Sequence, residues 1–340
     1  DGSVSLISIV LEPRDIHGGF IHQLLRSYPF QEEFYRFGKG IVADLWSTNY
    51  SEMKNIIIPV PSIDEQTTIA NFLDRETAKI DTLIDKQEQL IKLLEEKRQA
   101  VISHAVTKGL NPDVRMKDSG VEWLGEVPEH WDVISLKHLV SSSHGIQMGP
   151  FGGMLKDLEF EETGYKLYGQ ENTISGDFGK GSRWVAPERY MELSHYHLVE
   201  GDIVLTRKGS LGKARLITYL PHSGIIDSDT IRIRVNPKRL SKHFLAVLMH
   251  EAHYISEQIS RTRRGSVLSG LNSETIANLK ILLPSTTDEQ KILVTTVRDS
   301  QSRYTGAIEM SCEAIRLLKE RRTALISGAV TGKIDVRAVA

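Results

Sequence analysis

The residue groups of this chain that could do chemistry form incomplete patterns. His195–His197 contains the closest pair of histidines, but no cysteine lies nearby and no His-Glu-x-x-His sequence occurs, so a metal site is not predicted. The paired acids Glu161–Glu162 and Asp227–Asp229 alone support no acid–base assignment. We interpret Asp227 and Asp229 as turn residues, and we expect no catalytic residue and no metal in this chain.

Nucleotide and membrane chemistry are also not indicated. Gly149–Gly153 is glycine-rich but lacks the Gly-Lys-Ser/Thr that reaches phosphates, and no Asn-Pro-Pro-Tyr sequence is present to hold a flipped adenine. The single cysteine, Cys312, lies near Met310 and Ile315, so we expect it to pack inside the protein. One cysteine excludes a disulfide framework and indicates the cytoplasm. No apolar run approaches the ~20 residues that span a bilayer.

Charge is the remaining chemical signal. The net charge of the chain is -2, yet the segment from Asp202 to Leu283 contains thirteen basic and six acidic residues, a net charge of +7. The segment from Asp64 to Glu96 contains nine acidic and four basic residues, a net charge of -5. A basic segment beside an acidic one indicates a local surface for a polyanion, although a merely solvated charged surface has the same composition.

An internal repeat supplies the elements that would position these charges. Asp64–Thr107 recurs as Asp288–Thr331 at a constant offset of 224 residues, without a gap. Each copy follows an apolar, strand-like run that ends in proline, Ile56–Pro61 in one case and Ile281–Pro284 in the other. Both copies therefore begin in the same way.

Both copies are predicted to be long helices of a coiled coil. Leu73, Ile80, Leu94 and Val101 share a heptad position, Gln87 being the polar exception. Further apolar residues broaden this stripe, namely Leu83, Leu90, Ile84, Ile91 and Ala105. The second copy repeats the pattern with Val297, Tyr304, Leu318 and Leu325, and with Ser311 as the polar counterpart of Gln87.

A globular domain of mixed composition separates the helices. Predicted strands are 165–168, 203–206, 214–217 and 230–235, and a helix is predicted over 241–258. Phe20–Gly40 resembles Phe244–Gly265, and the chain opens inside a strand-like run, Val4–Leu11. Residues 1–62 therefore match the last third of such a domain, whose first ~110 residues would be missing. The fold class is α+β, with domains 1–62 and 111–286 alternating with helices 63–110 and 287–335.

Domain, helix, domain, helix resembles the specificity subunit of type I restriction–modification enzymes over essentially the whole chain. The motifs that carry the resemblance are Pro61–Gln66, Leu93–Ser103, Gly120–Gly125 with His130–Trp131, and Gly201–Ser210. Each motif alone is weak; their order together with the duplication is strong. In this setting we interpret Gly149–Gly153 as a turn of a recognition domain.

The resemblance implies the architecture and the partners. Each globular unit would be a target-recognition domain that reads one half of a split double-stranded DNA sequence, and the helices would pack antiparallel as a spacer. They would dock two modification subunits, which carry S-adenosylmethionine and methylate adenine N6, and a motor–nuclease restriction subunit could join. The chain itself would be non-catalytic, without a cofactor or a membrane association.

Candidate DNA contacts follow from side-chain chemistry, because Lys and Arg contact phosphates and guanine, and amides pair with adenine. An ordinary exposed surface is the competing interpretation for each residue. The candidates are Arg207, Lys208, Ser210, Lys213, Tyr168, Gln170, Asn172, Arg261, Arg263, Arg264, Ser266 and Asn272 in the second domain, and Arg36, Lys39 and Asn49 in the first.

Two other functions stay open on the sequence alone. One is the specificity chain of a related restriction enzyme whose methylation and cleavage functions share one polypeptide; its co-purifying partner would distinguish it. The other is a coiled-coil scaffold without a DNA role, for which removal of residues 115–285 would leave function intact.

Overall fold

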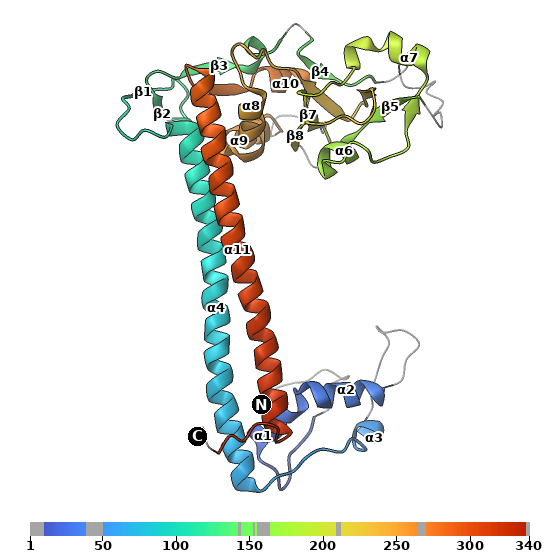
Figure 1. Cartoon of the computed structure of the whole chain (residues 1–340), viewed down its shortest axis with the longest axis vertical. Helices are drawn as coiled ribbons and strands as arrows, with labels where there is room; N and C mark the ends of the chain where they lie inside the picture. The colour runs from blue at the N-terminus through green and yellow to red at the C-terminus, as the bar shows by residue number, and fades with distance from the viewer. Residues whose placement is uncertain are drawn as a thin grey trace. The chain divides into compact units, whose positions relative to one another are not determined.

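The protein, analysed as a computed structural model, is described for residues 10–38, 50–141, 144–151, 154, 164–208, 212–263 and 270–337. The predicted strand Val4–Leu11 lies mostly outside these ranges. The chain forms two compact units, residues 1–95 with 305–340 (unit 1) and residues 96–304 (unit 2). The two long helices, α4 (Ile63–Lys108) and α11 (Thr287–Val330), each contribute to both units (Figure 1).

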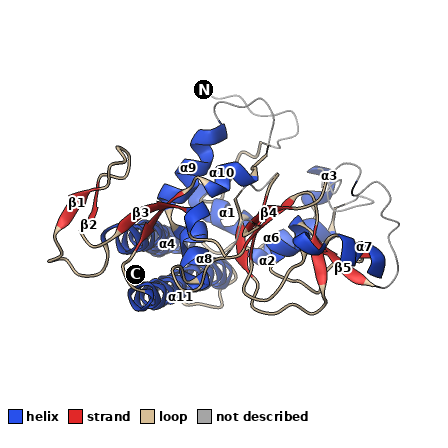
Figure 2. Ribbon diagram, turned by 90° about the horizontal axis from the view of Figure 1, so that it is seen from above, coloured by secondary structure: helices blue, strands red, loops and turns tan. Residues whose placement is uncertain are grey.

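The long helices pack antiparallel. In unit 1 the start of α4 shares a core with the end of α11, where Leu73 and Ile326 are buried, and Arg322 Nε donates to Asp81 Oδ1 at 2.9 Å. In unit 2 the order is reversed, since Ile102 near the end of α4 shares a core with Leu293 near the start of α11. Figure 2 shows the two helices adjacent and close to end-on. The predicted α+β class with two packed long helices is confirmed.

The buried stripe on α4 is narrower than predicted. Leu73, Ile80 and Ile84 are buried, whereas Leu83 and Leu90 are exposed. One partner helix covers only a narrow seam, so apolar positions beside the seam remain in contact with solvent.

Two positions on α11 show the same effect. Ser311, the counterpart of Gln87, is buried in the seam. Its neighbour Cys312 is exposed, so the expectation that this thiol packs inside the protein is wrong. A helix turns by about 100° per residue, which carries position 312 away from the seam that contains position 311.

Within its described residues, unit 1 adds three short helices to the helix pair: α1 (Gly18–Leu25), α2 (Tyr28–Arg36) and α3 (Tyr50–Met53). His17 and Ser27 cap the first two, each accepting a hydrogen bond from the backbone three residues on. Phe20 and Leu24 of α1 are buried against α4 and α11. Helix α1 is thus the element that fixes this end of the helix pair to the rest of the unit.

The described part of unit 2 contains four small sheets (Figure 1). A four-stranded antiparallel sheet has the order β4 (Ile146–Met148), β10 (Thr230–Ile233), β7 (Ile203–Thr206), β8 (Ala214–Leu216). A second sheet has the order β6 (Trp184–Val185), β5 (Tyr165–Tyr168), β9 (Gly224–Ile226), with β5 and β9 parallel. The remaining pairs are β1 (Met116–Asp118) with β2 (Glu126–Pro128), and β3 (Asp132–Ser135) with β11 (Lys280–Leu283). All four predicted strands are present, 165–168 and 203–206 with their predicted ends.

The helices of unit 2 are short apart from the shared long pair. They are α6 (Gln170–Ser175), α7 (Pro187–Glu192), α8 (Lys242–Glu251), α9 (His253–Arg263) and α10 (Ser273–Ala277), with 3-10 turns at Leu136–His138 and Ser194–Tyr196. The single helix predicted over 241–258 is wrong. Ala252 has an extended backbone (φ -80°, ψ 110°), which ends α8 and lets α9 start in a new direction.

A buried glutamine joins each long helix to the globular part of its unit. In unit 1 the Gln66 side chain accepts a hydrogen bond from His17 N at 2.7 Å and donates to Pro61 O at 2.7 Å. In unit 2 its counterpart Gln290 accepts from Ser241 N at 2.8 Å and donates to Arg239 O at 3.0 Å. His17 and Ser241 are the N-caps of α1 and α8. The sequence repeat therefore also repeats one hydrogen bond, from the N-cap backbone of a short helix to the glutamine. The carbonyl acceptor differs, since Pro61 precedes α4 itself and Arg239 precedes α8.

We expect Gln290→Ala to lower the free energy of unfolding by about 1–3 kcal/mol, because it removes the buried side chain that pairs with Ser241 N–H and Arg239 C=O. Thermal and urea unfolding would measure the loss. Gln89→Ala, at an exposed position of α4, is the control and should change stability little. Equal unfolding midpoints for the two variants would contradict the role assigned to Gln290.

Candidate nucleic-acid interface

Several strand ends in unit 2 meet at one end of the four-stranded sheet. Strand β10 is antiparallel to both β4 and β7, so its first residue lies beside the last residues of both neighbours. Thr206 N also donates to Lys213 O at 3.0 Å, which places the start of β8 at the same end. We call this region, formed by residues 149–151, 207–208, 213, 227–229 and 270–271, the polar sheet end.

Three predicted DNA-contact residues lie at the polar sheet end. Lys208 and Lys213 are exposed, and Lys208 Nζ lies 2.8 Å from Asp229 Oδ1. Arg207 is half-buried; its Nε donates to Leu271 O at 3.0 Å and its guanidinium to Ser228 O at 3.3 Å. The two lysines therefore present charge to solvent, whereas Arg207 connects the loops that surround them.

Asp227 organises the loops at this end. Its Oδ1 accepts hydrogen bonds from Asp229 N at 3.1 Å and Thr230 Oγ1 at 3.0 Å, so the interpretation of Asp227 as a turn residue is confirmed. Gly149 approaches the same turn so closely that a Cβ atom would lie 1.8 Å from Asp227 O. Only glycine permits this contact, which sets the path of the chain as it leaves β4.

Two residues at this site were not predicted. Arg183 donates to Asp227 Oδ2 at 2.9 Å, lies 3.6 Å from Glu171, and keeps about a third of its side chain exposed. Phe151 is largely exposed just beyond Gly149. Arg183 stands in a glycine-rich loop without any repeat or motif, so no sequence signal marked it. The sequence predicts Phe151 only as part of the turn Gly149–Gly153.

Two predicted base-reading residues are buried and have structural roles instead. Tyr168 is 1% exposed, its hydroxyl donates to His222 O at 2.7 Å, and burial raises its pKa to about 12. Asn172 accepts from Gly169 N at 3.0 Å and donates to Asp177 O and Lys180 O at 3.0 and 2.9 Å. With these bonds formed, neither side chain can pair with a base. Gln170, at the start of α6, is half-buried.

Arg261 and Asn272 line a separate surface depression of unit 2, together with Trp123. The Arg261 guanidinium lies 5.6 Å from the centroid of the Trp123 ring and 2.7 Å from Glu257. Asn272 Oδ1 accepts from Thr275 N at 2.7 Å as the N-cap of α10. Both residues are exposed, so Asn272 keeps its amide N–H₂ group for a further contact.

The other predicted contacts are dispersed or lie outside the described residues. Arg36 is exposed in unit 1 and lies 3.1 Å from Glu33. Arg263 ends α9, but its side chain is not described. Outside the described ranges lie Lys39, Asn49, Ser210, Arg264 and Ser266.

Part of the excess positive charge between Asp202 and Leu283 lies inside the protein. Arg234 donates two hydrogen bonds to the buried Asp202 carboxylate, at 2.7 and 2.8 Å. Arg232 is buried and donates to the carbonyl oxygens of His144, His195 and His197; burial lowers its pKa to about 10. The net charge of this segment therefore overstates the positive charge on its surface.

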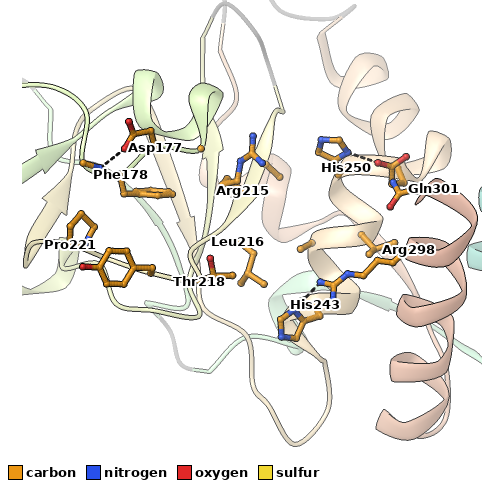
Figure 3. Close-up of a pocket in the computed structure, with 17 residues that line it drawn as sticks. Asp177, Phe178, Arg215, Leu216, Thr218, Pro221, His243, His250, Arg298 and Gln301 are labelled. Atoms are coloured by element: carbon orange, nitrogen blue, oxygen red, sulfur yellow. Dashed lines mark hydrogen bonds and ion pairs between the residues drawn. The ribbon is translucent and has the colours of Figure 1, made fainter. Parts of the chain in front are cut away.

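A cleft of about 680 Å³ separates β8 and the adjoining loops from α8 and α11 within unit 2 (Figure 3). Arg215 and Phe178 line one wall, and His243, His250 and Arg298 line the other. His243 Nδ1 lies 3.3 Å from the Arg298 guanidinium, and His250 Nδ1 lies 2.6 Å from Glu251 Oε1. The hydrogen bond that His250 donates to the Glu251 carboxylate raises the pKa of His250, while burial and the nearby Arg298 lower that of His243.

His195 and His197, the closest pair of histidines in the sequence, pack against other aromatic rings. The His197 ring stacks on Tyr190 at 3.7 Å, and His195 lies 4.4 Å from His144. Within the described ranges, no three His, Cys, Asp or Glu side chains form a group that could hold a metal ion. No helix in that part of the chain is both long and apolar enough to cross a membrane.

We expect the imidazole of His250 to titrate above the ordinary histidine pKa of about 6.5. In Glu251→Gln the acceptor charge is lost while burial, Arg215 and Lys213 still disfavour the cation, so the pKa should fall below that value. Histidine-resolved NMR titration measures both. An equal His250 pKa in Glu251→Gln and in the wild type would contradict the hydrogen bond between His250 and Glu251.

The raised pKa also implies a pH dependence of stability. A folded-state pKa above the unfolded one means that the contribution of His250 is fully present below about pH 6.5 and is lost as the pH rises through the folded pKa. The unfolding free energy of the wild type should therefore fall relative to His250→Gln above pH 6.5. Parallel stability profiles would contradict this.

Comparison with curated proteins identifies relatives along most of the chain. No family model matches it. It is 26% identical over 289 residues to the MjaVIII type I restriction enzyme specificity subunit of Methanocaldococcus jannaschii, covering 84% of this chain and 63% of the relative. It is 22% identical to the EcoKI specificity subunit of Escherichia coli, covering 84% of this chain and 59% of that protein. The chain thus spans about three fifths of the length of these relatives.

Solved structures agree on the fold. A chain from a study of complex assembly and conformational transition in the type I R-M system superposes with a TM-score of 0.68 at 16% identity, covering 94% of this chain and 72% of that one. The HsdS subunit from Thermoanaerobacter tengcongensis gives a TM-score of 0.57 at 18% identity, covering 93% and 70%. The predicted resemblance is confirmed: in sequence along most of its length, and in fold, the chain is similar to the specificity subunits of type I restriction enzymes.

Proposed function

We propose that this protein is a non-catalytic, DNA-sequence-recognition subunit of a type I restriction–modification complex. The observation that carries the proposal is the convergence of Lys208, Lys213 and Arg207 at one sheet end, in a chain similar to specificity subunits. Residues from separate segments gather there, as expected for a surface built to contact an extended polyanion.

The described contacts suggest a division of labour in unit 2. Lys208 and Lys213 would position the domain on DNA phosphates, because flexible ammonium groups act as point charges. Arg207 would hold the surrounding loops through its bonds to Leu271 O and Ser228 O. Arg261, whose guanidinium lies over Trp123, and Asn272 are candidates for contacts with base edges.

The duplicated junctions support a bipartite target. In each unit a glutamine near the start of the long helix accepts a hydrogen bond from the N-cap of a short helix and so holds a globular segment there, Gln66 in unit 1 and Gln290 in unit 2. Each junction would carry a domain that reads one half-site of double-stranded DNA. Two recognition domains can contact the same face of the DNA when their separation is one helical turn, ~34 Å, or a multiple of it.

The surface of the long helices supports docking of two equivalent partners. Leu93 on α4 and Leu317 on α11 are counterparts in the repeat, and they are 61% and 51% exposed. Exposed leucines on the same element in both copies favour two modification subunits, which would bring S-adenosylmethionine and methylate adenine N6. A motor–nuclease restriction subunit would complete the cleaving complex, and we expect the cytoplasm as its location.

Co-expression with a modification subunit from the same source, followed by sequencing of the host DNA for N6-methyladenine, tests the proposal. A split motif with a fixed gap would support a two-domain reader. A palindromic split motif would support two copies that read through residues 111–286. Absence of both new methylation and a complex would overturn the specificity function.

We expect Lys208→Ala and Lys213→Ala each to weaken DNA binding by the reconstituted complex at all sequences and to reduce the slope of log affinity against log salt by about 1. Binding titrations at several salt concentrations would measure this. Lys319→Ala, on an exposed face of α11, is the matched control and should keep the wild-type slope. Unchanged slopes in both test variants would exclude phosphate contacts at the polar sheet end.

A further inference from the structure

Arg183 lies where the strands of the second sheet meet the polar sheet end. Strands β5 and β9 are parallel, so their last residues, Tyr168 and Ile226, lie side by side, and Asp227 N donates to Tyr168 O at 2.8 Å. Strand β6 is antiparallel to β5 and begins directly after Arg183, whose carbonyl oxygen accepts from Leu167 N at 2.9 Å. The pairing of the strands therefore brings Arg183 beside Asp227.

The carboxylate of Asp227 holds both its own turn and the arginine. Its Oδ1 accepts the two hydrogen bonds that form the turn, and its Oδ2 accepts from Arg183 Nη2 at 2.9 Å. Asp227 is buried, whereas the side chain of Arg183 is 35% exposed. A carboxylate fixed inside the protein thus orients a guanidinium that solvent can still reach.

Gly169, the residue after β5, leaves room for this ion pair. A Cβ atom at position 169 would clash with Arg183 Nη2 and would lie 2.5 Å from Asp227 Oδ2. The φ of Gly169 is -124°, an ordinary extended value, so the backbone itself does not require glycine here. The lack of a side chain matters because any larger residue would displace the ion pair.

The charges around Arg183 favour a contact with a base edge over a contact with a phosphate. The guanidinium lies 2.9 Å from Asp227 and 3.6 Å from Glu171, and both carboxylates would repel a phosphate. Even with the nearby buried Lys166 counted as a cation, these four side chains carry no net positive charge.

The guanidinium also keeps donors for a further acceptor. Arginine has five N–H groups, and among the described residues no hydrogen bond of Arg183 uses Nε or Nη1. The edge of a base has no net charge and is recognised by directed hydrogen bonds. A guanidinium held at one nitrogen and exposed at the others suits that kind of contact.

We propose that Arg183 reads a guanine in the half-site that unit 2 contacts, donating two parallel hydrogen bonds to guanine O6 and N7 in the major groove. Asp227 is the positioning residue, and Gly169 supplies the space for the pair. Because Asp227 already orients the guanidinium, less conformational entropy is lost when the base binds. This inference rests on the proposed DNA-recognition function and names one base contact within it.

The methylated motif of the full chain, co-expressed with its modification subunit, is the first test. We expect Arg183→Ala to relax one guanine position of the motif while all other positions keep their base. Arg183→Lys should relax the same position, because an ammonium group cannot form two parallel hydrogen bonds. Arg189→Ala is the matched control and should keep the wild-type motif, since Arg189 is likewise partly exposed (29%) and paired with Glu192 at 2.7 Å.

A wild-type motif in Arg183→Ala would overturn this inference and leave the proposed function standing. Absence of methylation by the wild-type complex would overturn both.

Modified DNA separates base reading from a purely structural ion pair. Each guanine of the wild-type motif is replaced in turn by 7-deazaguanine, which lacks the N7 acceptor. At one guanine we expect the wild-type complex to lose at least fivefold in affinity and the Arg183→Ala complex less than twofold. Each comparison uses one protein and two DNAs, so a general loss of stability cancels. Equal losses in the two complexes at every guanine would overturn the assignment, even where Arg183→Ala abolishes methylation.

Gly169→Ala displaces the guanidinium without removing it. The added methyl group meets the ends of the Arg183 and Asp227 side chains, so the ion pair must move while the backbone keeps its extended conformation. We expect the same guanine position to relax as in Arg183→Ala, in a protein whose circular dichroism spectrum matches the wild type. A wild-type base preference at that position would contradict the positioning of Arg183 by Asp227.

Discussion

The rest of the structure depends on one buried side-chain amide that occurs twice. Gln66 and Gln290 are each about 1% exposed, and each accepts from the N-cap backbone of a short helix while donating to a carbonyl oxygen just before a helix. A buried amide is costly unless both its ends are paired, and the pairing is satisfied in only one arrangement of the chain. The amide therefore fixes α1 against α4, and α8 against α11, more specifically than apolar packing alone would.

The basic residues of unit 2 divide between the inside and the surface of the domain. The buried Asp202 carboxylate accepts two hydrogen bonds from the partly exposed Arg234 guanidinium, and the buried Arg232 donates to carbonyl oxygens. These charges hold the four-stranded sheet to its loops and are not available to a polyanion. The proposed DNA contact therefore rests on a few exposed cations at strand ends, which is consistent with an overall net charge of -2. A few positioned cations can fix the orientation of a protein on a polyanion, while contacts to base edges supply sequence selectivity.

The helical framework was predictable, whereas the detail of the candidate site was only partly so. The repeat at an offset of 224 identified both long helices, and apolar patterning placed the strands 165–168 and 203–206. The break at Ala252 was not predictable, because both sides have helical periodicity and the interruption follows from packing of α8 and α9. Tyr168 and Asn172 have the right chemistry to read bases, but burial assigns them to the core. Side-chain chemistry indicates what a residue can do, and tertiary packing decides whether it is exposed to do it.

The repeat separates what must stay constant from what can vary. The junctions use Gln66, Gln290 and the caps of α1 and α8, whereas the polar sheet end uses Lys208, Lys213 and turns around Asp227. No residue of the second group forms a hydrogen bond of the first. Lys208 and Lys213 are exposed and can change without leaving a buried polar group unpaired, so their substitution costs little stability, whereas the buried Asp227 holds its turn. A change in the junction leaves buried groups without partners. The same framework can therefore carry different polar surfaces at its strand ends.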